Sequence, residues 1–108
     1  MEWYSNLYLG EGLESKADQI INKIKKNQLT PEIYLIAFSS NPDNLLDIIP
    51  SWELMQKGYP KGKMKVIGLA KGKMQALELV RYIVDETYQN TGTADVLGYI
   101  NQKMEEQL

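Results

Sequence analysis

The stretch from Lys65 to Tyr88 constrains the fold more than any other part of this sequence, because it joins a strand pattern to a long helix pattern. Residues 65–70 are almost continuously apolar, which is typical of a strand covered on both faces and favours a parallel strand. A turn at Lys71-Gly72-Lys73 follows. The apolar positions after it leave only a narrow polar stripe, so residues 73–90 are predicted to be a helix that packs on the sheet. The stretch therefore indicates the second half of a β-α-β-α unit.

The rest of the chain supplies the other elements of that unit. Residues 33–39 are β-rich and apolar throughout and form the clearest strand pattern. Residues 4–9 form either a short edge strand, which we prefer, or an aromatic arm laid over the core. Further helix patterns lie at residues 13–28, 42–56 and 94–105. The predicted fold class is α/β, a small layered unit in which a two- to three-stranded, mainly parallel sheet is covered by about four helices.

Pro50 interrupts the second of these helix patterns. Proline lacks the amide hydrogen and its ring clashes with the carbonyl four residues back, so Pro50 is expected to break or kink a helix over residues 42–56. Before it, Asn41 suits an N-cap and Pro42 the first helical position. After it, Ser51 is expected to cap a short turn that runs through Met55.

Length and composition indicate one ordinary domain over residues 1–108. The chain is 44% hydrophobic and 24% charged, with a net charge of −2. Such a balance gives no general reason to expect a nucleic acid or an anionic membrane as a partner. The start of the chain lacks a basic and apolar leader, and no window approaches the length of a membrane span. A cytoplasmic location is therefore the expectation.

The sequence gives no sign of catalysis. It contains neither histidine nor cysteine, which removes the usual general base, the thiol nucleophile and the commonest metal ligands. Gly10-x-Gly12-x-x-Ser15 matches the dinucleotide fingerprint poorly, since its third small residue is serine and the strand before it is weak. We therefore lean against an enzyme and expect no cofactor and no metal.

One pattern resembles that of known proteins. Ser39-Ser-Asn-Pro-Asp-Asn-Leu-Leu-Asp-Ile48, followed by Val66-Ile-Gly-Leu-Ala-Lys-Gly72 and an Ala/Leu-rich helix, is similar to a pattern in small bacterial α/β proteins that have no assigned function. The resemblance covers about residues 30 to 100. It implies no activity, ligand or binding residue.

A small-anion site is one functional hypothesis. If the two strong strands are parallel, the turns that follow them meet at one edge of the sheet, where α/β proteins bind ligands. Each turn also opens a helix whose free amides favour an anion such as a nucleotide phosphate. The alternative is that these residue types are simply what short strand-to-helix turns require. The residues concerned are Ser39, Ser40, Asn41, Asn44, Lys71, Gly72 and Lys73.

Protein interaction is the other hypothesis, and the one we prefer. A sheet of two or three strands leaves edges that are templates for pairing with another chain. Aromatic and methionine side chains are enriched at interface cores. We therefore expect an accessory or interaction protein without catalytic activity, which forms a homodimer or binds another protein. The interface residues expected are Trp3, Tyr4, Tyr8, Trp52, Met55 and Tyr59.

Charge is unevenly spread along the chain. Six lysines and no acid lie between Glu53 and Glu78, while the last two helix patterns are rich in acids. The lysine-rich loop lacks the arginines and interleaved aromatic residues of a nucleic-acid surface. We interpret it as a solvated loop that pairs with the acidic helices.

Overall fold

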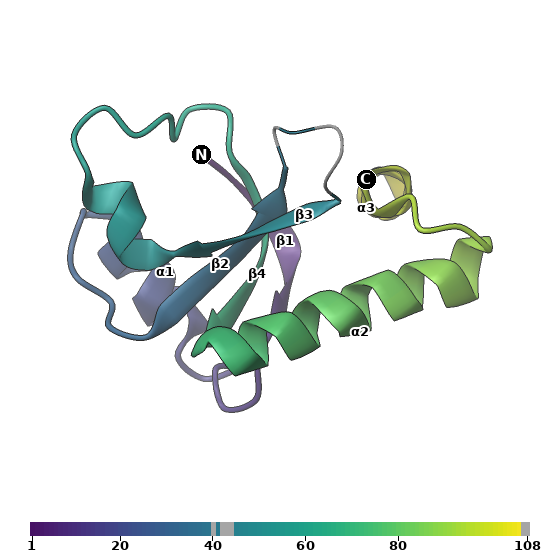
Figure 1. Cartoon of the computed structure of the whole chain (residues 1–108), viewed down its shortest axis with the longest axis horizontal. Helices are drawn as coiled ribbons and strands as arrows, with labels where there is room; N and C mark the ends of the chain where they lie inside the picture. Colours follow the sequence, from purple (N-terminus) through teal and green to yellow (C-terminus); the bar gives the residue numbers. More distant parts are fainter. Residues whose placement is uncertain (40, 42–44, 107–108) are drawn as a thin grey trace.

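A computed structural model describes residues 1–39, 41 and 45–106. The described chain forms one four-stranded sheet in the order β1-β4-β2-β3, with helices against both of its faces (Figure 1). The strands are β1 (Glu2–Leu9), β2 (Ile33–Phe38), β3 (Leu46–Pro50) and β4 (Lys65–Lys71). The helices are α1 (Ala17–Lys25), α2 (Lys73–Thr91) and α3 (Val96–Glu106), with a short 3₁₀ turn, η1 (Ser51–Met55).

The expected strands form, but the sheet differs from the prediction, because it has four strands where two or three were expected and is mixed where a mainly parallel sheet was expected. Residues 33–39 and 65–70 do pair in one sheet, yet β2 and β4 run antiparallel, with Ile33 opposite Lys71. The parallel neighbour of β4 is β1, so the sheet is mixed. The prediction failed because a continuous apolar run indicates that both faces of a strand are covered. It does not indicate whether the strand runs parallel or antiparallel to its neighbours.

The helix predicted over residues 42–56 is wrong at residues 46–50. Residues 46–50 form β3, which pairs antiparallel with β2, and Pro50 ends this edge strand. A proline is tolerated there because an edge strand has one side without ladder hydrogen bonds. The proposed cap at Asn41 and Pro42 cannot be compared, because Pro42 is outside the described residues.

The short turn expected after Pro50 is confirmed as η1. The Ser51 hydroxyl does not cap it. This hydroxyl accepts a hydrogen bond from Thr30 Oγ1 at 2.7 Å and donates one to the Thr30 carbonyl at 2.9 Å. Both residues are buried, so this pair satisfies polar groups that would otherwise be costly to bury.

Three α-helices form in the described residues where about four were predicted. The helix expected over residues 73–90 is α2, and that expected over 94–105 is α3. The first helix is shorter than the predicted range 13–28. At the end of α2, Gly92 adopts a left-handed conformation (φ 76°) and its amide donates to the Tyr88 carbonyl at 2.8 Å, which is the usual glycine stop of a helix.

Two apolar layers enclose the sheet. On one face, Ile20 and Ile24 of α1 and Leu54 of η1 pack against strand residues such as Leu35. On the opposite face, α2 and α3 pack against strand residues such as Ile36. Because successive strand residues point to opposite faces, β2 needs apolar residues at almost every position. Among the described residues, no helix combines the length and hydropathy needed to cross a membrane.

Gly68 lies where four elements meet. Ile36 pairs with Gly68 whereas the next residue of β2, Ala37, pairs with Val66, so β4 carries an extra residue at this step, as in a β-bulge. A Cβ atom on Gly68 would lie 3.1 Å from the Tyr8 carbonyl oxygen and 3.3 Å from both Ile36 Cγ1 and Leu79 Cδ2. The close approach of β1, β2 and α2 to this point of β4 therefore depends on glycine.

We predict that Gly68→Ala destabilises the fold by about 1–3 kcal/mol, because the added methyl group overpacks this junction. Urea denaturation followed by circular dichroism measures the change. Gly62→Ala is the matched control, since a Cβ at residue 62 meets no atom within 4 Å. Equal denaturation midpoints for the two variants would contradict the prediction.

Candidate functional site: a trough between β1 and α2

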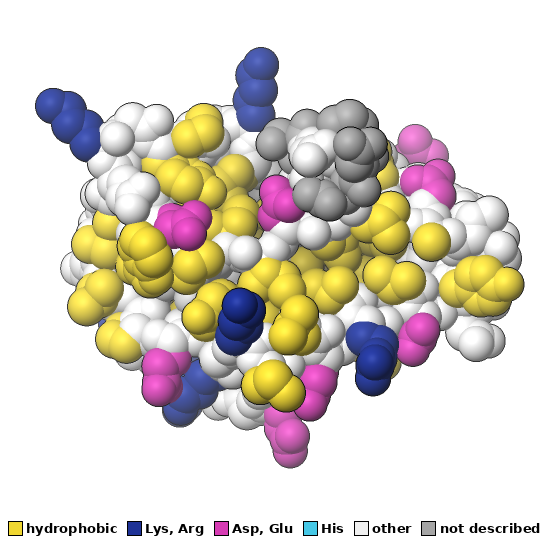
Figure 2. All heavy atoms as spheres, in the orientation of Figure 1, with side chains coloured by type: hydrophobic (Ala, Val, Ile, Leu, Met, Phe, Trp, Pro, Cys, Tyr) yellow, Lys and Arg dark blue, Asp and Glu magenta, His cyan; other side chains and the backbone are white. Residues whose placement is uncertain are grey.

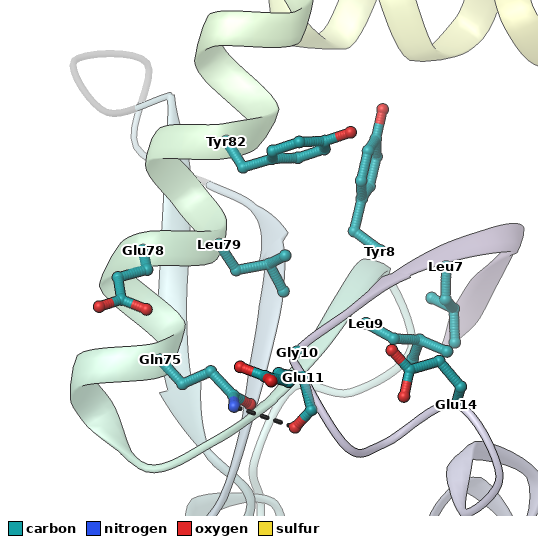
Figure 3. Close-up of a pocket in the computed structure, with 10 residues that line it drawn as sticks. All are labelled: Leu7, Tyr8, Leu9, Gly10, Glu11, Glu14, Gln75, Glu78, Leu79 and Tyr82. Atoms are coloured by element: carbon teal, nitrogen blue, oxygen red, sulfur yellow. Dashed lines mark hydrogen bonds between the residues drawn. The ribbon is translucent and has the colours of Figure 1, made fainter.

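A trough of about 500 Å³ lies between the C-terminal end of β1 and the N-terminal half of α2 (Figure 3). Its walls come from the two elements and from the loop that follows β1. The lining residues are Leu7, Tyr8, Leu9, Gly10, Glu11, Glu14, Gln75, Glu78, Leu79 and Tyr82.

The interior of the trough is mainly apolar. Leu7 and Leu9 come from β1, while Leu79 and Tyr82 come from α2. Three consecutive residues of β1 contribute, because the trough runs beside an edge strand and not only over one face of it. Tyr82 is 58% exposed, so its ring offers an open aromatic surface to a ligand.

Gln75 closes one end of the trough. Its Oε1 accepts a hydrogen bond from the Lys71 amide at 2.7 Å, and its Nε2 donates to the Glu11 carbonyl at 3.2 Å. The side chain fits only because residue 10 is glycine: a Cβ on Gly10 would lie 1.8 Å from Gln75 Oε1. The glycine that resembled a nucleotide fingerprint therefore serves the packing of this loop against α2.

The rim of the trough is acidic. Glu11, Glu14 and Glu78 are all exposed, and within the described residues none of them forms an ion pair. They do not form a metal site, since no described group of three or more carboxylates is placed to hold a metal ion. The rim therefore presents three carboxylates whose charge is not neutralised by neighbouring side chains.

A polar cluster fixes the opposite end of the trough. The Tyr8 hydroxyl donates to Glu86 Oε2, and the Tyr99 hydroxyl donates to the same oxygen at 3.1 Å. Lys103 Nζ lies 3.5 Å from that oxygen and also lies over the rings of Tyr8 and Tyr99, at 5.7 and 5.2 Å. The cluster thus ties β1, α2 and α3 together around one carboxylate.

Burial and mutual contact shift the pKa values of this cluster. Burial raises the pKa of Tyr8, and its hydrogen bond to the Glu86 carboxylate raises it further. Burial alone would raise the pKa of Glu86, but hydrogen bonds from Tyr8 and Tyr99 and the Lys103 charge outweigh burial and lower it. Burial would lower the pKa of Lys103, yet the Glu86 carboxylate raises it. At neutral pH, Lys103 and Glu86 therefore form an ion pair. The Glu86 carboxylate also accepts hydrogen bonds from the hydroxyls of Tyr8 and Tyr99.

The structure does not bring together the residues of the proposed anion site. Ser39 and Asn41 follow β2, whereas Lys71 ends β4 and Gly72 and Lys73 follow it. The antiparallel pairing puts the C-terminal ends of these two strands at opposite ends of the ladder. Lys71 Nζ lies 3.8 Å from Glu32 Oε2, an exposed pair. Ser40 and Asn44, also part of that prediction, lie outside the described residues.

The residues expected at an interface divide between the two faces of the sheet. Tyr4 is 2% exposed and belongs to the core beneath α2 and α3, with Tyr8 beside it. Trp3 and Tyr59 pack against the core on the α1 side. Two further members of the predicted set, Trp52 and Met55, lie exposed on η1.

Sequence reasoning missed the cluster and most of the trough. Tyr8 was singled out only as an interface aromatic, and Glu86, Tyr99 and Lys103 were not singled out. A weak signal exists in the spacing of Tyr99 and Lys103, which at i, i+4 share one face of α3. Their partner Glu86 on α2 is identifiable only once the two helices are placed.

No family model, curated protein or solved structure matches this chain.

We predict that Glu86→Ala destabilises the protein by about 2 kcal/mol, because a half-buried carboxylate that accepts charge-assisted hydrogen bonds is removed and its donors lose their partner. Glu86→Gln keeps an acceptor and loses only the charge, so we expect about 1 kcal/mol. Urea denaturation at neutral pH measures both variants. Glu105→Gln, at an exposed position of α3, is the control and should be neutral.

The stabilising contribution of the Glu86 charge should also depend on pH. Because the pKa of Glu86 is lowered in the folded protein, its contribution is complete above the unfolded pKa of about 4.3 and is lost as the pH falls through the folded pKa. The stability difference between wild type and Glu86→Gln should therefore shrink on acidification below about pH 4. A difference that stays constant with pH would refute the ionised state assigned to Glu86.

Proposed function

We propose that this protein is an accessory, protein-interaction module without catalytic activity of its own. Its binding site is the trough between β1 and α2, and the ligand is a segment of a partner protein that carries apolar and basic side chains. The observation that carries this proposal is an apolar interior beneath three exposed carboxylates.

The apolar interior supports a ligand with apolar side chains. A trough of about 500 Å³ falls in the usual range of ligand sites, which is roughly 300–1,000 Å³. Burial of apolar side chains against Leu7, Leu79 and the exposed ring of Tyr82 supplies the favourable free energy, since apolar area removed from water is the main driving force of association. Tyrosine is also enriched in the cores of protein interfaces.

The rim supports a basic ligand. Glu11, Glu14 and Glu78 surround the apolar interior, and a lysine or arginine on the ligand would meet them at the edge of the trough. Exposed ion pairs contribute little each, of order 0.2–1 kcal/mol. They act chiefly on the rate of association and on the choice of partner, because an acidic segment is repelled.

The edge strand supports an extended ligand. Among the described strands, only β4 pairs with β1, so no strand covers the outer edge of β1 at residues 7–9, which line the trough. Strand addition to such an edge is a common way for a domain to hold an extended peptide. Along a strand, successive side chains point to opposite faces of the sheet, which would send one set into the trough and leave the other set outside it.

No observation favours the alternative function, binding of a small anion at residues 39–41 and 71–73. Its two halves follow strands that run in opposite directions, and Lys71 already lies near Glu32. The trough between β1 and α2 carries carboxylates at its rim, which repel anions.

We predict that a synthetic peptide of alternating leucine and lysine binds the protein, whereas a peptide of alternating leucine and glutamate does not. Fluorescence anisotropy of the labelled peptides measures both. Binding should weaken as salt is raised, because exposed charges are screened over about 10 Å at 0.1 M ionic strength. Absence of binding at low salt would refute the proposal.

A charge-matched pair of variants locates the site. Glu14→Lys/Glu78→Lys replaces two attractions by repulsions and should weaken the Leu/Lys peptide about tenfold. Glu105→Lys/Glu106→Lys changes the net charge equally at exposed positions of α3 and should have little effect. If both double variants weaken binding to the same extent, binding depends on the net charge of the protein and not on the carboxylates of the trough.

A further inference from the structure

One flank of α2 carries an apolar stripe that the fold does not use. Ala76, Leu79 and Ile83 face the sheet and are buried. About a third of a turn away, Leu77 and Tyr88 are 48% and 60% exposed, and Val84, between them on the same flank, is half-buried. Single exposed apolar residues are ordinary, but a stripe at helical spacing indicates a contact surface.

The stripe continues onto the sheet. Tyr34 of β2 and Leu46 and Ile48 of β3 face the α2 side of the sheet and are only half-buried. In the space-filling view, hydrophobic side chains gather in the region between β3 and α2 (Figure 2). This apolar face lies on the opposite flank of α2 from the trough, which uses Gln75, Glu78, Leu79 and Tyr82.

The face also carries self-complementary charge. Arg81 and Asp85 lie one turn apart beside the stripe, both exposed. If a second α2 packs antiparallel about a two-fold axis near Val84, Leu77 of each copy comes beside Tyr88 of the other. In the same register, Arg81 of each copy comes beside Asp85 of the other. Such reciprocity is what a two-fold interface requires of a surface that meets itself.

We propose that the occupant of this face is a second copy of the chain. In this dimer the two α2 helices pack antiparallel through Leu77, Val84 and Tyr88, each covers the half-buried residues of β2 and β3 in the other copy, and two Arg81–Asp85 pairs form at the rim. The surface differs from the aromatic set expected from the sequence, and the proposal does not depend on the ligand of the trough.

Sedimentation equilibrium through the micromolar range tests the dimer. We expect a dimer mass, and we expect Leu77→Asp to raise the dissociation constant about tenfold or more, because it puts a charge into the apolar contact with Tyr88 of the other copy. Leu97→Asp is the matched control, since Leu97 is 50% exposed on α3, and it should leave the mass unchanged. Circular dichroism verifies that each variant is folded.

Charge reversal tests the register. Arg81→Asp alone and Asp85→Arg alone each place like charges opposite one another and should weaken the dimer, whereas Arg81→Asp/Asp85→Arg should restore it. A monomer mass at all concentrations would overturn the proposal. So would a dimer that tolerates Leu77→Asp, or one that dissociates instead on Trp52→Ala.

Discussion

The need to cover both faces of β4 and β2 governs this structure. Leu35 and Ile36 are neighbours in the chain, yet each is fully buried, on opposite faces of the sheet. A short chain meets this need by dividing its helices: α1 and η1 cover one face, and α2 and α3 cover the other. Each layer is thin, so the placement of α3 depends on a polar contact as well as on apolar packing. The Glu86 carboxylate provides that contact for Tyr99 and Lys103.

Local patterns in the sequence predicted most of the elements but not how they pair. The strands at 33–39 and 65–70 and the helix at 73–90 were predictable because their apolar patterns are long and nearly uninterrupted. The direction of β4 relative to β2 was not, because strands covered on both faces have the same composition whether parallel or antiparallel. Residues 46–50 were misassigned because Leu46, Ile48 and Ile49 suit either a helix or a strand. Pairing with β2 then decides between them.

The candidate site was less predictable than the fold, since it depends on distant residues. The trough joins Leu7 and Glu11 to Glu78 and Tyr82, and the cluster at its end joins Tyr8 to Glu86. None of these pairs is close in sequence, and each side chain alone is an ordinary surface or core residue. Of the errors in the predicted fold, the error in strand direction had the largest effect on the predicted function. It had suggested an anion site at Ser39 and Lys71, whereas the antiparallel ladder separates these residues and leaves a trough beside β1.

The two proposed binding surfaces lie on opposite flanks of α2, which determines whether binding at one surface affects binding at the other. Between the flanks, α2 is held to the sheet by buried Ala76, Leu79 and Ile83, and close-packed interiors resist small displacements. A ligand at Glu78 and Tyr82 and a second copy at Leu77 and Arg81 would therefore contact α2 without competing for the same side chains. Coupling between two sites requires an element with two alternative arrangements. A helix anchored by buried side chains from Ala76 to Thr87, and by the contacts of Glu86, favours a single arrangement, so peptide affinity and dimer affinity should be independent of one another.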